Sequence, residues 1–218
     1  MGQSISQFLA WIEFRLGAEI DAAGRAIADT SWSAQLQASE RLWMVLEGTH
    51  VITIMLFAGT ILFVDLRLLG IVLRKVPVSQ VADNVLPLTV GGFAVMAITG
   101  VLLFFAQPLE YFHSLIFRFK ILFLVVAAIN IFWFHYKVQR SRAEWDARAV
   151  PPFSARVSAT MSIALWILVI ATGRYAAYGW VSCENIGGLA ADAAQCSTYA
   201  ATLAQYEDGA DNHALAGL

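Results

Sequence analysis

Four long apolar stretches constrain this chain more than any other feature of its sequence. Crossing a bilayer as a helix takes about 20 mostly apolar residues, and four segments qualify: residues 44–72, 85–106, 115–136 and 159–180. Of the 218 residues, 59% are apolar and 14% are charged, whereas soluble domains average about 45–50% and about 25%. The sequence therefore predicts an all-α, polytopic membrane protein, folded as a four-transmembrane-helix bundle.

The segments on either side of the bundle are predicted to lie outside the bilayer. Within residues 1–40, apolar side chains recur at helical spacing along residues 4–16. We expect this stretch to form an N-terminal interfacial helix that lies on the membrane surface. Residues 41–180 then form the transmembrane domain, and residues 181–218 form an acidic tail.

The positions of the basic residues predict how the bundle is oriented. The link between the first two spans carries Arg67, Arg74 and Lys75, and the link between the third and fourth spans carries five more Lys and Arg. Residues 106–117 and the tail after Trp180 carry none. Because basic loops stay on the cytoplasmic side, we expect a bacterial inner-membrane protein with both termini in the periplasm.

The two cysteines lie in the tail, which this orientation places in the oxidising compartment. Cys183 and Cys196 are therefore predicted to form a disulfide, which stabilises by about 3 kcal/mol in the chain-entropy description. Two free thiols are the alternative. No histidine lies between the cysteines, so the spacing does not indicate a metal site.

Ionisable side chains from three spans fall at one depth in the outer half of the predicted bundle. A charge near the centre of a spanning helix costs roughly 2.5–3.5 kcal/mol, so such groups usually pair, line a cavity or hold a ligand. Glu47 and His50 share one helix face, and His113 precedes the third span. The whole candidate group comprises Glu47, His50, His113, Arg118, Lys120 and Arg174.

Three interpretations of this group remain open from the residues alone. Histidine is the usual ligand of a b-type haem in a helical bundle, and nearby cations can neutralise the haem propionates. A copper or zinc ion bound by histidine together with Glu47 is the second interpretation. The third is a structural network in which Glu47 pairs with Lys120 or Arg174 and His50 is hydrogen-bonded.

A second polar group is expected at the cytoplasmic ends of the spans. Asp65 and Arg67 close the first span, and His135 closes the third. His135 beside Asp65 could be a second haem ligand, a proton relay or a structural ion pair. We favour the structural interpretation, because these residues lie near water.

Five short phrases of the chain stand out together: E-G-T-H at 47–50, F-V-D-L-R-L-L-G at 63–70, T-G-V-L-L-F at 99–104, F-R-F-K at 117–120 and N-I-F-W-F-H at 130–135. They resemble an uncharacterised bacterial family of small inner-membrane proteins. That family is distantly similar to the copper-resistance D membrane domain and to the haem-binding membrane protoporphyrinogen oxidase. The resemblance implies that His50 and Lys120 serve haem binding, and His50 with Gly59 also matches the copper-resistance pattern.

We therefore predict a membrane protein that carries one haem b per chain and serves electron transfer or other redox work. His50 and His113 would ligate the iron, Glu47 would orient His50, and Lys120 with Arg174 would neutralise the propionates. An enzyme of this kind would be a haem-dependent oxidoreductase. A metal or small-solute transporter and a cofactor-free structural subunit are the rival functions. The expected partners are the lipid bilayer and a quinone or a redox protein. The sequence is also compatible with a homo-oligomer. Nothing in it indicates binding to nucleic acid.

Overall fold

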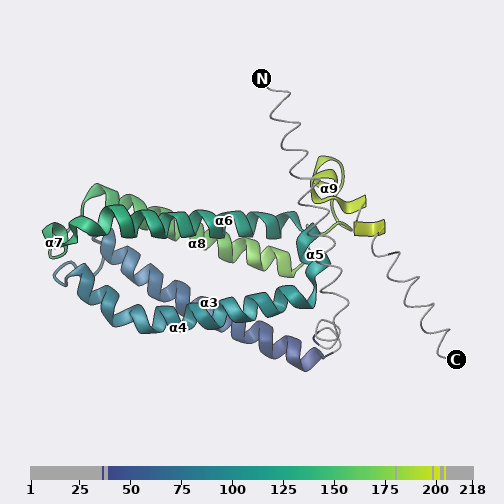
Figure 1. Ribbon diagram of the computed structural model, residues 1–218, viewed down its shortest axis with the longest axis horizontal. Coiled ribbons are helices and arrows are strands. Elements are labelled where there is room, and N and C mark those ends of the chain that lie inside the picture. The colour runs from purple at the N-terminus through teal and green to yellow at the C-terminus, as the bar shows by residue number, and fades with distance from the viewer. Residues whose placement is uncertain (1–35, 37–38, 180, 198, 202–203, 205–218) are drawn as a thin grey trace, which may run out of the picture.

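The computed structural model describes residues 39–179, 181–197 and 199–201, together with the single residues 36 and 204. Every regular element within these residues is a helix (Figure 1), and four helices are long and apolar enough to cross a membrane. This confirms the predicted all-α membrane bundle. The interfacial helix expected over residues 4–16 lies outside the described residues. The four long helices are α3 (Glu40–Leu68), α4 (Val78–Ala106), α6 (Leu115–Trp133) and α8 (Phe153–Ala177).

The long helices run alternately up and down the bundle (Figure 1). Helix α3 packs against α4 and α8, and α6 packs against α8. The start of α3, the short helix α5 (Pro108–His113) and the tail helix α9 (Leu189–Ala194) lie at one end, here called the outer end. The opposite, inner end holds a π-helical turn (Phe134–Val138), a 3₁₀ turn (Gln139–Ser141) and α7 (Arg142–Trp145).

Several helix boundaries differ from the sequence prediction. Helix α3 ends at Leu68 rather than at residue 72, because Gly70 takes a left-handed conformation (φ 71°) and its N–H bonds back to the carbonyl of Arg67. Helix α4 begins at Val78 rather than at residue 85. Its first turn is capped by Asp146, whose carboxylate accepts the N–H of Ser79 at 2.8 Å.

Helix α8 begins earlier than predicted, at Phe153 rather than at residue 159. Pro151 and Pro152 come directly before it, and Pro152 takes the N-cap position. Proline is favoured at helix starts, because its fixed φ suits the first turn and its missing N–H would have no intrahelical partner there. The disulfide between Cys183 and Cys196 is formed as predicted, with a Cα–Cα distance of 5.2 Å.

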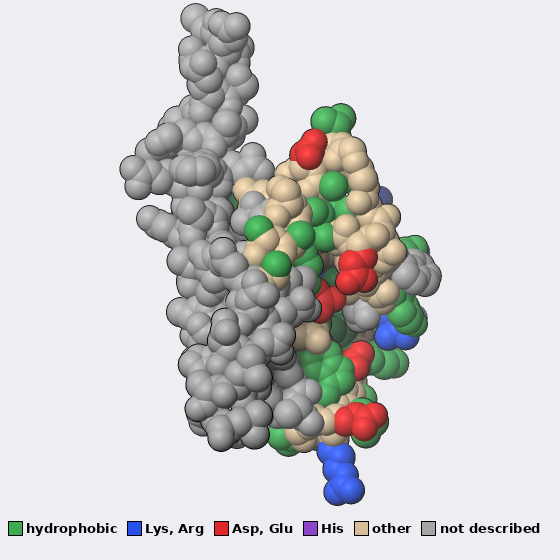
Figure 2. All heavy atoms as spheres, turned by 90° about the vertical axis from the view of Figure 1, so that its right-hand side faces the viewer, with side chains coloured by type: hydrophobic (Ala, Val, Ile, Leu, Met, Phe, Trp, Pro, Cys, Tyr) green, Lys and Arg blue, Asp and Glu red, His purple; other side chains and the backbone are tan. Residues whose placement is uncertain are grey.

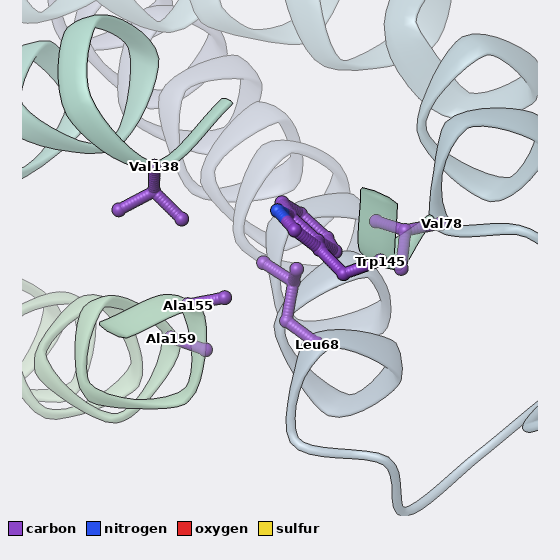
Figure 3. Close-up of a cluster of buried hydrophobic side chains, with 6 residues drawn as sticks. All are labelled: Leu68, Val78, Val138, Trp145, Ala155 and Ala159. Carbon is purple, nitrogen blue, oxygen red and sulfur yellow. The ribbon is translucent and has the colours of Figure 1, made fainter. Parts of the chain in front are cut away.

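A compact apolar cluster holds the inner end together (Figure 3). Trp145 of α7 is 3% exposed, and its indole N–H donates to the Ser141 hydroxyl at 3.2 Å. This satisfies the one polar group of a buried aromatic side chain. The cluster comprises Leu68, Val78, Val138, Trp145, Ala155 and Ala159. It joins α3, α4 and α8 to the inner links, so these ends of the spans are fixed relative to one another.

A second cluster fills the middle of the bundle, where Phe57 of α3 meets Trp166 of α8 edge to face, with ring centroids 4.8 Å apart. Large apolar side chains such as Met55, Ile98 and Phe132 are exposed on the outside of the bundle. This pattern is expected of helices whose faces directed away from the bundle contact lipid.

Candidate functional site

His50 of α3 is held by a threonine of the neighbouring helix. Its Nδ1 lies 2.9 Å from Oγ1 of Thr99 on α4. The Thr99 hydroxyl has one proton and also lies within hydrogen-bond distance of two carbonyls of its own helix, 2.8 Å from that of Val95 and 3.1 Å from that of Met96. We assign this proton to the backbone, so that the Thr99 oxygen accepts from His50 and Nδ1 carries a hydrogen. In the neutral imidazole, the lone pair is then on Nε2, which is the form that binds a metal.

Two glycines give His50 and Lys120 room inside the bundle. A Cβ added to Gly100 of α4 would lie 2.9 Å from Cε1 of His50, and a Cβ on Gly173 of α8 would lie 3.4 Å from Nζ of Lys120. All four spans thus meet at this level, which we call the His50 layer. It consists of His50, Thr99, Gly100, Lys120 and Gly173.

Lys120 brings a positive charge into the His50 layer from α6. It is close enough to His50 for its charge to act on the imidazole. Its Nζ also lies 5.9 Å from the ring centre of Phe117, one turn earlier on the same helix. Within the part of the chain that the structure describes, no carboxylate or other hydrogen-bond acceptor pairs with this ammonium group. A half-buried cation in a membrane span normally has such a partner.

The structure places the other predicted outer residues away from the His50 layer. Glu47 lies near Tyr111 of α5. We expected Glu47 to orient His50, but the side chain that contacts Nδ1 of His50 is Thr99. Arg118 donates from Nη1 to the Ala193 carbonyl of the tail at 2.7 Å. Arg174 is exposed on α8, where its guanidinium lies 4.3 Å from the ring centre of Tyr178.

His113 is buried at the outer end rather than in the His50 layer. It is 2% exposed, its Nδ1 donates to the Ala194 carbonyl at 2.9 Å, and its ring lies 5.3 Å from that of Tyr199. Because a carbonyl can only accept, His113 also carries its hydrogen on Nδ1. His50 and His113 thus use Nδ1 for different partners, Thr99 and the Ala194 carbonyl.

His113 lines a half-open pocket of about 290 Å³, here called the outer pocket. Its walls come from α5, the end of α8 and the disulfide-closed tail, and Figure 2 shows acidic side chains gathered on this end of the molecule. Sequence reasoning missed this pocket, because most of its lining lies outside the four spans. Its polar lining includes Glu110, Tyr111, His113, Tyr175, Tyr178, Glu184 and Tyr199.

The carboxylates of the outer pocket perturb one another and the neighbouring phenols. Burial raises the pKa of Glu110, and the charge of Glu184 raises it further. Burial, together with Glu110 and then Glu47, raises the pKa of Tyr111 to about 12. The pKa of Tyr199 is raised by the same causes, burial first and then Glu110 and Glu184. Two carboxylates, Glu110 and Glu184, therefore lie close enough to the phenols of the pocket to act on them.

At the inner end, the predicted polar residues are separated rather than paired. Asp65 is 6% exposed and lies near Ser162 of α8, while His135 is exposed in the π-helical turn. Arg67 is fully buried and donates to the carbonyls of Val76 at 2.8 Å and Arg148 at 3.0 Å. Arg67 thus ties both inner links to α3.

Two buried atoms at the inner end, Oδ2 of Asp65 and Nη1 of Arg67, have no hydrogen-bond partner among the described residues. One turn deeper, Asn130 of α6 exchanges two hydrogen bonds with Ser158 of α8, both 3.0 Å long. This pair is the interhelical contact expected of an amide inside a membrane.

No three or more His, Cys, Asp or Glu side chains come together as a metal-ion site within the described ranges. A haem iron needs fewer protein ligands, since the porphyrin supplies four nitrogens.

Residues 43–179, more than half of the chain, match a family described as of unknown function, DUF6644. No curated protein and no solved structure gives a significant match.

Proposed function

We propose that this chain, which belongs to the DUF6644 family, is a membrane-embedded electron-transfer protein that binds one b-type haem in its outer half. The observation that carries the proposal is the contact of His50 Nδ1 with Oγ1 of Thr99, 2.9 Å away. In the tautomer that we assign, Nδ1 donates to Thr99 and the neutral ring presents Nε2 as a ligand. Haem ligands in proteins are usually oriented in this way by an acceptor on the second ring nitrogen.

Lys120 fits the second requirement of such a site, a cation for the propionates. Its ammonium group has no acidic partner among the described residues and lies at the level of His50. A propionate would supply the missing negative charge and offset the cost of the lysine in the membrane. Gly100 and Gly173 support the proposal too, because they leave the space that these two side chains use.

The remaining ligand assignments stay predictions. His113 has the same Nδ1-bound form as His50 but belongs to the outer pocket. A second axial role for it would require α3 and α5 to approach. Arg174 and Arg118 stand near the outer surface on exposed or half-buried positions, and Glu47 stands near Tyr111. Lys120 is therefore the cation that we assign to the propionates.

When bound, the haem would supply one-electron chemistry, and the chain would set its potential. Thr99 would hold His50 in place, and Lys120 would favour the more negative reduced state through its charge. The bilayer surrounds the site, and a quinone or a redox protein is the partner that we propose.

The proposed location is the bacterial inner membrane, with both termini in the periplasm. The start of α3 and the tail lie at the same end of the bundle, where the disulfide forms. The basic residues of the links lie at the other end, which supports a cytoplasmic position for that end.

The proposal is tested by removing the acceptor that orients His50. We expect Thr99→Val to weaken haem retention about 10–100-fold, as loss of such acceptors does for bound metals. The matched control is Thr89→Val on the same helix, since the Thr89 hydroxyl bonds only to its own helix at the Val85 carbonyl, 2.9 Å away. Haem titration of the apoprotein, followed by absorption, measures both. Equal haem affinity in the two variants would contradict the role of His50.

A further inference from the structure

The outer pocket lies apart from the proposed haem site. His50, Thr99 and Lys120 do not line it, and its walls come from α5, the end of α8 and the tail. Its volume of about 290 Å³ is at the lower end of the range for small-molecule sites, about 300–1,000 Å³. It opens at the outer end of the bundle, so a ligand would enter from the periplasmic side of the proposed orientation.

The charges of the pocket are unbalanced. Glu110 comes from α5 and Glu184 from the loop after α8, and none of the described residues that line the pocket is Lys or Arg. Neither carboxylate forms an ion pair with another described residue. Each carboxylate is near enough to act on Tyr199, and Glu184 acts on Glu110. A cation in the pocket would relieve this repulsion.

The walls of the pocket are aromatic. Tyr111, Tyr175, Tyr178 and Tyr199 reach it from three different segments of the chain. The faces of aromatic rings attract cations within about 6 Å, most strongly cations that shed water easily. The guanidinium of Arg174 already lies 4.3 Å from the ring centre of Tyr178. Tyr178 thus already has the protein's own Arg174 on its ring, which leaves Tyr111, Tyr175 and Tyr199 as the aromatic walls for a ligand.

The segments that bear the acids and aromatics are held in place. Asn185 donates to the Gly179 carbonyl at 2.9 Å and to the Ser182 hydroxyl at 3.1 Å, which fixes the loop that carries Glu184. The disulfide between Cys183 and Cys196 joins this loop to the end of α9. His113 of α5 donates to the carbonyl of Ala194, the last residue of α9. A preformed site loses little conformational entropy when it binds a ligand.

We propose that the outer pocket binds a small organic ammonium ion, with its charge between Glu110 and Glu184 and its methyl or methylene groups against the tyrosines. A bare divalent metal ion fits this pocket less well. Only two carboxylates reach it, and no set of three or more His, Cys, Asp or Glu metal ligands forms within the described parts of the chain. The inference does not depend on the haem proposal.

Choline and its neutral isostere 3,3-dimethylbutan-1-ol provide the test. The disulfide-intact full-length protein in lipid nanodiscs would be titrated with each compound by isothermal calorimetry. We expect saturable binding of choline and at least tenfold weaker binding of the neutral alcohol, since the two differ in charge and not in shape. No saturable binding of choline, or equal binding of the two compounds, would overturn the proposal.

Two charge-neutralising variants locate the site. Glu184→Gln, at an exposed position that the fold tolerates, should weaken choline binding about tenfold, which corresponds to about 1.4 kcal/mol. Asp192→Asn removes the same charge from α9 at the same end of the molecule but outside the pocket lining, and should leave choline binding unchanged. Equal losses in both variants would show a diffuse charge effect and would also overturn the assignment.

Discussion

Substitution of Gly100 by alanine tests the packing on which the His50 layer depends. The added Cβ would lie 2.9 Å from Cε1 of His50, whereas carbon atoms in contact prefer about 3.5–4.0 Å. The ring or the helix must therefore move by roughly 0.6 Å or more. The ring cannot turn away without losing its hydrogen bond to Thr99. Such overpacking typically costs about 1–3 kcal/mol.

Gly91 of the same helix provides the control for this substitution. A Cβ at Gly91 meets nothing within 4 Å. Alanine at either position gains up to about 1 kcal/mol of helix propensity. That gain cancels in the comparison, so Gly100→Ala should be about 1–3 kcal/mol less stable than Gly91→Ala.

The assay is unfolding of each variant in mixed detergent micelles, followed by far-ultraviolet circular dichroism. A second pair of variants carries His50→Ala, which removes the ring that the new methyl group meets. In that background, the difference between Gly100→Ala and Gly91→Ala should disappear, because the cycle isolates the contact. An unchanged difference, or no difference in the wild-type background, would refute the packing described for His50.

Three further predictions concern other parts of the molecule. Lys75→Cys should be protected from a membrane-impermeant thiol reagent in intact cells and Asp192→Cys should be labelled; the reverse result would invert the proposed orientation. Asn130→Leu should cost about 0.6–1.7 kcal/mol in unfolding experiments, and adding Ser158→Ala should cost little more, because the two side chains bond each other; fully additive costs would contradict that pairing. Burial and a neighbouring carboxylate raise the pKa of Glu110, so the folded state holds this proton more tightly than the unfolded state. The free energy of unfolding should therefore fall as pH rises from the ordinary pKa of a glutamate through the raised pKa of Glu110. Glu110→Gln should remove that loss above this window and change nothing below it; a pH–stability curve parallel to that of the wild type would contradict the shift.

The four spans could be predicted from the sequence because the length of an apolar run decides whether a helix can cross a bilayer. Their ends could not, since they depend on distant contacts. The cap of α4 comes from Asp146, which lies 67 residues away in sequence from Ser79. The burial of Arg67 depends on carbonyls from both inner links.

Depth along each helix places His50 and Lys120 at one level, but depth does not determine the direction in which a side chain points. Arg174 follows Gly173 directly, and one residue turns the side chain by about 100° around the helix. Gly173 therefore faces Lys120, while Arg174 is exposed beside Tyr178. The contact of Thr99 with His50 could not be predicted from the sequence. A threonine in an apolar helix usually bonds to the backbone of its own helix, as Thr99 also does.

The outer pocket was beyond prediction for a different reason. Tyr111, Glu184 and Tyr199 are separated by long stretches of sequence and meet only because the tail folds back over α5. The disulfide was predictable, since two cysteines in one tail that is expected to lie outside the cytoplasm have few other roles. That the disulfide-closed tail forms one wall of the outer pocket could be seen only in the structure.

The reduced-minus-oxidised absorption spectrum of the purified protein, with its haem quantified, tests the central claim most directly. We predict a b-type spectrum with one haem per chain, which is lost in His50→Ala and retained in His135→Ala, while both variants keep the helical content of the wild type. A wild-type protein that is colourless and iron-free when isolated from haem-replete cells would contradict the account, as would a wild-type spectrum in His50→Ala.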